Sequence, residues 1–219
     1  MSELEKEIKE RITSYAWDVV DGKILACQNI ILACKRFIAF LQRDDMYFDI
    51  EEVEKTIRFF GKFKHFTGQY NRHSFTLQEW QKFMLCGIYG FKWKKDDTRV
   101  TRTFILSVSR KQGKTSCISI MAIKALLEEN NAQVIVAANS ASQASILFKM
   151  ASSYLKSLGG KVDKLFRRFR DRIMFDKTDS SMRVVSADAS RLDGLNCNFA
   201  VVDEISQAPN SDVYDVLES

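Results

Sequence analysis

The sequence contains little proline and glycine, with one proline and nine glycines among 219 residues. A proline and glycine content this low excludes a collagen-like chain, and it is far below that of a disordered or loop-dominated chain. Long apolar runs are also missing, because the longest, such as Ile30–Cys34 and Val134–Ala138, have five residues. A membrane-spanning helix needs roughly 20. The N-terminal MSELEKEIKER is charged and no apolar stretch follows it, so we expect no secretory signal and no membrane span.

The charge balance is only mildly positive, since lysine and arginine exceed aspartate and glutamate by 33 − 28 = 5. This permits a nucleic-acid partner without requiring one. Two stretches concentrate the basic residues: 92–102 holds five against two acidic ones, and 161–172 holds six against two. Such runs are usually solvated faces and sometimes contact phosphates. The five cysteines lack CxxC or zinc-like spacing, which favours reduced thiols buried in a cytosolic protein.

The N-terminal third of the chain predicts a small helical bundle. Apolar residues recur at a spacing near 3.6 along Leu4–Val19 and again along Ile24–Leu41. The pattern Asp49-x-x-Glu52 is typical of a capping box that opens a third helix. We therefore expect a helical N-terminal subdomain over residues 1–73 and a second domain over residues 74–219.

From residue 74 onward, short apolar segments alternate with helical ones. Thr76-x-x-Glu79 indicates a capping box for one helix, and longer helices are expected over 114–130 and 140–158. Strands are expected at Phe104–Val108, Val134–Ala138, Ile173–Phe175, Met182–Ser186 and Phe199–Val202. Strands that alternate with helices of this length indicate crossover connections. The expected fold is therefore α/β, with a mostly parallel central sheet flanked by helices.

The segment SRKQGKTS, residues 109–116, lies between the first of these strands and its helix, where a phosphate-binding loop has to lie. Gly113 lets the backbone approach a phosphate, and N–H groups of the loop and the helix N-terminus point towards it. Lys114 can reach the β- and γ-phosphates, and the Thr115 hydroxyl can bind Mg²⁺. The full consensus would have a glycine where this chain has Val108, so the loop is a deviant form. The alternative is a surface turn that happens to read Gly-Lys-Thr.

A second motif follows downstream, where four apolar residues run directly into Asp203 and Glu204. A strand that ends in Asp-Glu is typical of an aspartate that holds Mg²⁺ and a glutamate that acts as general base for water. Taken alone, the pattern fits a strand end capped by solvated acids equally well. Together with the phosphate-binding loop, it predicts hydrolysis of a nucleotide.

These motifs resemble the large terminase subunit of tailed bacteriophages, the ATPase that drives DNA into the capsid. The loop carries an arginine, Arg110, where other phosphate-binding loops have small residues. The pattern Leu77-x-x-Trp80-Gln81-x-Phe83 resembles the family's adenine-recognising glutamine motif. AANSASQAS (137–145), SADASRLDGLN (186–196), VVDE (201–204) and the helical N-terminal half are also similar to the family. The resemblance covers nearly the whole chain and implies a RecA-like fold of the additional-strand, catalytic-glutamate class.

The resemblance also implies roles for individual residues. Glu204 would be the catalytic base, Arg110 would contact the γ-phosphate from within its own subunit, and Arg191 would act on a neighbour's nucleotide. The alternative for Arg191 is a surface arginine on a loop. Thr115 and Asp203 would hold Mg²⁺. The residues that would bind ATP are Gln81, which reads the adenine, and the loop residues Ser109, Arg110, Lys111, Gln112, Gly113, Lys114, Thr115 and Ser116.

The partners that the resemblance implies are double-stranded viral DNA, the procapsid and its portal, and the terminase small subunit, with further copies of the chain forming a ring. No membrane partner is expected. The protein would act in the host bacterial cytoplasm and transiently at the portal. Family members continue beyond the catalytic glutamate to a coupling motif and a nuclease domain, whereas this chain stops at Ser219. We therefore expect an incomplete ATPase domain without nuclease activity.

Two other functions remain open at this stage. The first is a fragment of a RecA-like helicase or translocase. Helicases commonly carry Asp-Glu-x-His or Asp-Glu-x-Asp after the strand, whereas this chain has Asp-Glu-Ile-Ser at 203–206 and no second RecA-like domain. The second is a module that binds a nucleotide without turning it over.

Overall fold

The chain forms two compact units. We analysed a computed structural model that describes residues 2–65, 73–138, 141–186 and 197–205. Unit 1 combines residues 1–62 with 74–106, and unit 2 combines residues 63–73 with 107–219. This division differs from the boundary expected at residue 73. The reason is that the segment after residue 74 packs on the N-terminal helices and pairs with a strand there.

Unit 1 is mainly helical, as its apolar periodicity predicts. Its elements are α1 (Glu3–Arg11), α2 (Tyr15–Val20), α3 (Gln28–Phe40), β1 (Met46–Phe48), α4 (Ile50–Phe60), α5 (Glu79–Leu85), the π-helix η1 (Cys86–Gly90) and β2 (Phe91–Trp93). The stripe Leu4–Val19 belongs to two helices rather than one. Between them the Thr13 hydroxyl accepts a hydrogen bond from the Tyr15 N–H, a local bond that competes with a continuous helix.

Of the two helix starts predicted in unit 1, one is confirmed and the other is wrong. The Asp49 side chain accepts a hydrogen bond from the Glu52 N–H at 2.9 Å, which confirms Asp49 as the N-cap of α4. The expected start at Thr76 is wrong. The N-cap of α5 is Gln78, whose backbone N–H donates to the Gln81 side-chain oxygen at 2.9 Å. A glutamine three residues after the cap replaces the expected glutamate in this role.

An aromatic cluster forms the centre of unit 1. The rings of Phe37, Phe48 and Phe91 pack edge-on with centroids 5.0 to 5.7 Å apart, an arrangement that aromatic pairs prefer. Strands β1 and β2 pair antiparallel and bring Phe48 opposite Phe91. Gly90 permits this packing, since a Cβ atom there would lie 2.2 Å from the Phe48 ring.

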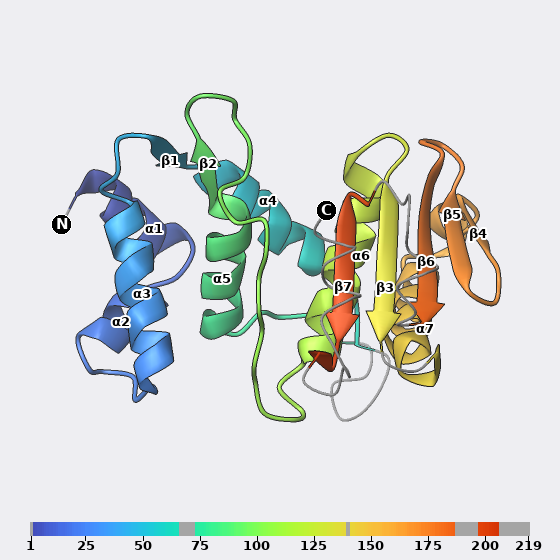
Figure 1. Cartoon of the computed structure of the whole chain (residues 1–219), viewed down its shortest axis with the longest axis horizontal. Coiled ribbons are helices and arrows are strands. Elements are labelled where there is room, and N and C mark those ends of the chain that lie inside the picture. Colours follow the sequence, from blue (N-terminus) through green and yellow to red (C-terminus); the bar gives the residue numbers. More distant parts are fainter. Residues whose placement is uncertain (1, 66–72, 139–140, 187–196, 206–219) are drawn as a thin grey trace. The chain divides into compact units, whose positions relative to one another are not determined.

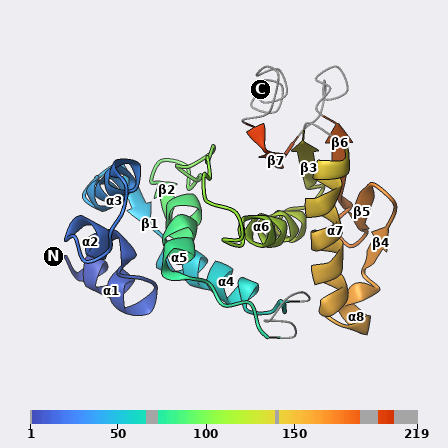
Figure 2. The same ribbon diagram turned by 90° about the horizontal axis from the view of Figure 1, so that it is seen from below.

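Unit 2 is a sheet with two long helices on one face. Its elements are α6 (Lys114–Glu128), β3 (Gln133–Ala138), α7 (Ala141–Ser157), α8 (Gly160–Asp163), β4 (Phe166–Arg168), β5 (Arg172–Phe175), β6 (Ser180–Ser186) and β7 (Phe199–Asp203). The strand order is β4-β5-β6-β3-β7 (Figure 1). Figure 2 shows α6 and α7 side by side against the same face of this sheet. Their buried apolar residues and those of β3 form the core of unit 2.

The sheet differs from the expected one in two ways. It is mixed rather than mostly parallel, because β6, β3 and β7 run parallel while the hairpin β4–β5 adds two antiparallel pairings. The expected strand Phe104–Val108 is wrong, since these residues form no strand. Phe104 and Ile105 are 44% and 79% exposed, whereas a strand inside a parallel sheet is buried on both faces.

The helices expected at 114–130 and 140–158 are confirmed as α6 and α7, and the strands expected in β3 and β7 are confirmed within one residue. Within the described parts of the chain, we find no helix that is both long and apolar enough to cross a membrane.

Candidate functional site

The N-terminus of α6 is built as a phosphate-binding loop requires. Gly113 is the N-cap of α6 and has a left-handed backbone with φ 79°, a conformation that glycine adopts without steric cost. Lys111, two residues earlier, also has a positive φ of 68°. The loop thus turns sharply into a 15-residue helix. The first N–H groups of such a helix carry partial positive charge and form an anion-binding position.

The two sequence motifs meet at this helix end. The Lys114 ammonium lies 2.8 Å from Asp203 Oδ1, and the two side chains are 31% and 16% exposed. Asp203 is the last residue of β7 and is level with Ala138, the last residue of β3. The site therefore lies at the carboxyl ends of two neighbouring parallel strands, where ligands bind in open α/β sheets.

Glu204 follows Asp203 in an unusual backbone conformation. Its φ is 55°, a left-handed value that costs a residue other than glycine about 1–3 kcal/mol. The Glu204 N–H donates to Asp203 Oδ1 at 3.0 Å. The same carboxylate oxygen thus accepts from Lys114 and from the Glu204 backbone, which fixes its orientation. Both acidic residues are partly buried.

The first two turns of α6 are anchored to α7 by two serines. The Ser119 hydroxyl donates to the backbone oxygens of Thr115 and Leu147 at 2.7 and 3.2 Å. The Ser116 hydroxyl lies 3.5 Å from the Met150 sulfur. Because the Ser116 side chain faces α7, contact of this residue with a phosphate would come from its backbone N–H. Thr115 is partly exposed.

Tyr154 of α7 is a contributor to this end of the site that the motifs do not reveal. It is 2% exposed and forms a hydrogen bond with Ser116. Burial raises the pKa of its phenol, and the bond with Ser116 acts in the opposite direction. Phe63 packs edge-on against the Tyr154 ring at 5.6 Å. The apolar pattern of α7 predicts a core position here, but no signal in the sequence identifies the partner serine.

The other expected site residues are not all brought together. Ser109, Arg110, Lys111 and Gln112 are exposed on the loop before α6. Gln81 belongs to unit 1, is 4% exposed and uses its side-chain oxygen to cap α5. Arg191 lies outside the described residues, as do most of the segment 186–196 and residues 139–140 of the segment 137–145.

The fold and the site define the class. A glycine-containing loop leads into a helix, and the first lysine of that helix meets an aspartate at the end of a parallel strand, as in P-loop proteins. The sequence model described as "Terminase large subunit, ATPase domain" matches residues 79–219. The chain therefore belongs to the family of terminase large subunit ATPase domains. No curated protein matches the chain.

Similar folds occur among solved structures. A crystal structure of the HK97 bacteriophage large terminase is similar with a TM-score of 0.62 and 24% sequence identity, over 76% of this chain and 34% of that one. The chain thus spans about a third of the length of that terminase. A mutant of the Thermus phage P74-26 large terminase ATPase domain matches at 23% identity over 50% of each chain with a TM-score of 0.42.

Proposed function

We propose that the protein is a Mg²⁺-dependent ATPase of the catalytic-glutamate class, and that it hydrolyses ATP to power the movement of viral DNA into a procapsid. The observation that carries this proposal is the 2.8 Å contact between Lys114 and Asp203. It joins the phosphate-binding loop to the acidic strand end across 89 residues of sequence. The contact lies where a left-handed glycine opens α6 and a parallel strand ends, which is where ligands bind in such sheets.

The residues present fit a magnesium ion. Asp203 offers a carboxylate and Thr115 a hydroxyl, and Mg²⁺ prefers hard oxygen ligands of this kind and completes its shell with water and substrate phosphates. In the described residues, no three histidine, cysteine, aspartate or glutamate side chains are grouped to hold a metal by themselves. When bound, Mg²⁺ would supply positive charge that offsets the charge of the phosphates. Thr115 and Asp203 would hold it on the protein side.

Each of the other proposed site residues would have its own role in ATP binding or hydrolysis. Lys114 would leave Asp203 and compensate the negative charge of the β- and γ-phosphates. Glu204 would accept a proton from the attacking water as the new bond to phosphorus forms and the bond to ADP breaks. Arg110 would contact the γ-phosphate from the exposed loop, and backbone N–H groups from Ser109 to Ser116 would cradle the phosphates. Gln81 would read the adenine edge, and Arg191 would serve a neighbouring subunit's nucleotide.

The wider setting of this proposal comes from the family. The partners would be double-stranded viral DNA, the portal and procapsid, the terminase small subunit and further copies of the chain in a ring. The place of action would be the host bacterial cytoplasm and, transiently, the procapsid portal.

The test is a comparison of binding with turnover in Glu204→Gln. The amide cannot accept the proton of water, so ATP hydrolysis should stop while Mg·ATP still binds. Phosphate release by the protein and equilibrium binding of a fluorescent ATP analogue measure the two quantities. Normal turnover by the variant would overturn the proposed role of Glu204. If neither the wild type nor the variant bound nucleotide, the proposed function itself would be wrong.

A further inference from the structure

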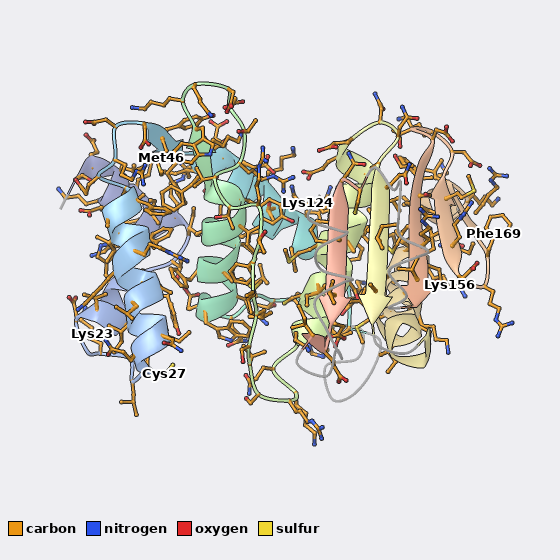
Figure 3. The ribbon with its side chains drawn as sticks, viewed as in Figure 1. Lys23, Cys27, Met46, Lys124, Lys156 and Phe169 are labelled. Carbon is orange, nitrogen blue, oxygen red and sulfur yellow. The ribbon has the colours of Figure 1, made fainter. Side chains whose placement is uncertain are left out.

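The hairpin β4–β5 forms the outer end of the described sheet of unit 2, because β4 is the last strand in the order beyond β5. The Phe169 N–H donates to the Arg172 carbonyl at 2.7 Å and closes a tight turn formed by Arg170 and Asp171. Figure 3 shows Phe169 at the outer side of this hairpin, away from β3. The hairpin and the short α8 before it contain the basic run 161–172.

Part of the charge in this run is neutralised within the fold. Arg167 pairs with Asp176 at 2.6 Å, and Arg168 forms an ion pair with Asp163. Four basic side chains remain exposed and form no ion pair with the described residues: Lys161, Lys164, Arg170 and Arg172. Asp171 is the one remaining acidic residue of the run, so the residues of the run outside these ion pairs carry a net charge of 4 − 1 = +3. We refer to these four residues as the hairpin cations.

The other basic run of the chain is used differently. Of its residues, Lys92 is held by Asp49 at 2.7 Å, Lys95 lies 3.6 Å from Asp96, and the Arg99 guanidinium lies over the Tyr89 ring. Most of that charge thus supports the local structure of unit 1. The hairpin cations form no ion pair or ring contact of this kind with the described residues. The amino-acid composition of the two runs does not reveal this difference.

We propose that the hairpin cations are a contact surface for the phosphate backbone of double-stranded DNA. A polyanion matches a group of uncompensated cations, and the planar guanidinium groups of Arg170 and Arg172 suit bidentate contacts to phosphate oxygens. The identity of the ligand as duplex DNA rests on the proposed function, whereas the preference for a polyanion rests on the charges. Phe169, which is 53% exposed and directly precedes Arg170 in the turn, would pack against the sugar edge.

The test compares two double variants with the same change of net charge. Arg170→Gln/Arg172→Gln removes two hairpin cations, and the control Lys23→Gln/Lys55→Gln removes two exposed lysines that already pair with Asp18 and Glu52. Binding of a fluorescent 30-base-pair duplex, or of a single strand of equal length, is titrated without nucleotide at several salt concentrations. Each lost phosphate contact should lower the slope of log affinity against log salt by about 0.9. The magnitude of this slope should therefore fall by about 2 in the hairpin variant and should not change in the control.

Several results would overturn the proposal. The first is an equal slope of log affinity against log salt for duplex binding by the hairpin variant and the wild type. The second is an equal loss of this slope in both double variants, and the third is a loss of slope seen only with the single strand. A further contrary result is a hairpin variant that self-associates with unchanged DNA binding. That outcome would mean that the charges only protect an edge strand from pairing with other chains. Because the titration uses no nucleotide, failure of the proposed ATPase activity would be seen separately, in the phosphate-release assay.

Discussion

Each unit contains a lysine–aspartate ion pair, and the two pairs have almost the same geometry. Lys92 and Asp49 of unit 1 lie 2.7 Å apart with side chains 20% and 21% exposed, and Lys114 and Asp203 of unit 2 lie 2.8 Å apart with side chains 31% and 16% exposed. Their surroundings differ. Asp49 also caps α4 through the Glu52 N–H, whereas Lys114 opens α6 beside a left-handed glycine. Distance and burial therefore do not separate the structural pair from the pair that we propose to be functional, and the proposal rests on the position of Lys114 and Asp203 in the fold.

The largest expected difference between the pairs is in catalysis. Asp203→Asn should slow ATP hydrolysis about 100-fold or more, on the scale of losing one preorganised electrostatic group. It should also strengthen binding of ATP without Mg²⁺, because Lys114 is no longer held by a carboxylate. Asp49→Asn is the matched control and should leave both quantities unchanged. Phosphate release and nucleotide titrations in EDTA measure them, and equal effects of the two substitutions would contradict the distinction.

The two units should also respond differently to nucleotide. Burial raises the pKa of Cys34 in unit 1 to about 11 and that of Cys117 in α6 to about 12, so these thiols react only when their surroundings open. Mg·ATP at 100 times its dissociation constant stabilises the unit that binds it by about 2.7 kcal/mol. Alkylation of Cys117 should then slow about 100-fold, and that of Cys34 should slow far less, because unit 1 contributes only Gln81 to the proposed site. Mass spectrometry of quenched samples can show this. Equal slowing would mean that the units open together.

The Lys92–Asp49 pair should contribute to the stability of the folded protein. Asp49→Ala removes the cap of α4 and the ion pair, and we expect it to lower the free energy of unfolding by about 1–2 kcal/mol. Asp49→Asn should cost less, because asparagine also caps helices. Urea unfolding followed by circular dichroism measures both. If Asp49→Ala slowed ATP hydrolysis but left the free energy of unfolding unchanged, the Lys92–Asp49 pair would be functional rather than structural.

The pH dependence of that stability follows from the pKa of Asp49. Burial raises this pKa, but the hydrogen bonds from Lys92 and the Glu52 N–H outweigh burial, and the net shift is downward. A lowered pKa in the folded state contributes stability above the unfolded value of about 3.9, and this is lost as pH falls through the folded pKa. The stability difference between the wild type and Asp49→Asn should thus be constant from about pH 5 to 8 and shrink below pH 4. A difference that grew on acidification would contradict this.

The smallest expected effect is on nucleotide choice. Gln81→Glu keeps an oxygen that can accept from the Gln78 N–H but loses the amide donor for adenine. Because this side chain is only 4% exposed, a charged carboxylate there should lower the stability of unit 1, and the preference for ATP over GTP should fall by several-fold. The relative hydrolysis rates of the two nucleotides test this. An unchanged preference would leave Gln81 as a capping residue only.

The sequence predicted the parts of unit 2 that depend on local pattern. The helix after the phosphate-binding loop and the strand that ends in Asp203 follow from periodicity and from an apolar run with a defined end. That Lys114 and Asp203 belong to one site was expected from two motifs of known chemistry, although their direct contact was not. The expectation of one site needed no knowledge of the strand order, because the carboxyl ends of parallel strands meet at one edge of a sheet.

Features that depend on pairing or on local competition were not predictable in this way. The apolar run Phe104–Val108 has the composition of a strand but no neighbouring strand in the described sheet, and composition does not reveal whether a partner is present. The hairpin β4–β5 turns back through Arg170 and Asp171 without the Asn-Gly or Asp-Gly signal of tight turns. For α5, two capping patterns overlap, and the one with glutamine at the third position forms.

The central claim is that the Lys114–Asp203 pair marks a nucleotide site rather than a structural contact. The most direct test is the equilibrium affinity for Mg·ATP of the wild type, Lys114→Ala and Lys92→Ala. Loss of the Lys114 ammonium leaves the phosphate charge uncompensated, so we predict at least about tenfold weaker binding, on the scale of one charge-assisted hydrogen bond. Lys92→Ala should bind as the wild type does. Equal affinities of Lys114→Ala and the wild type, with both proteins folded, would contradict the claim.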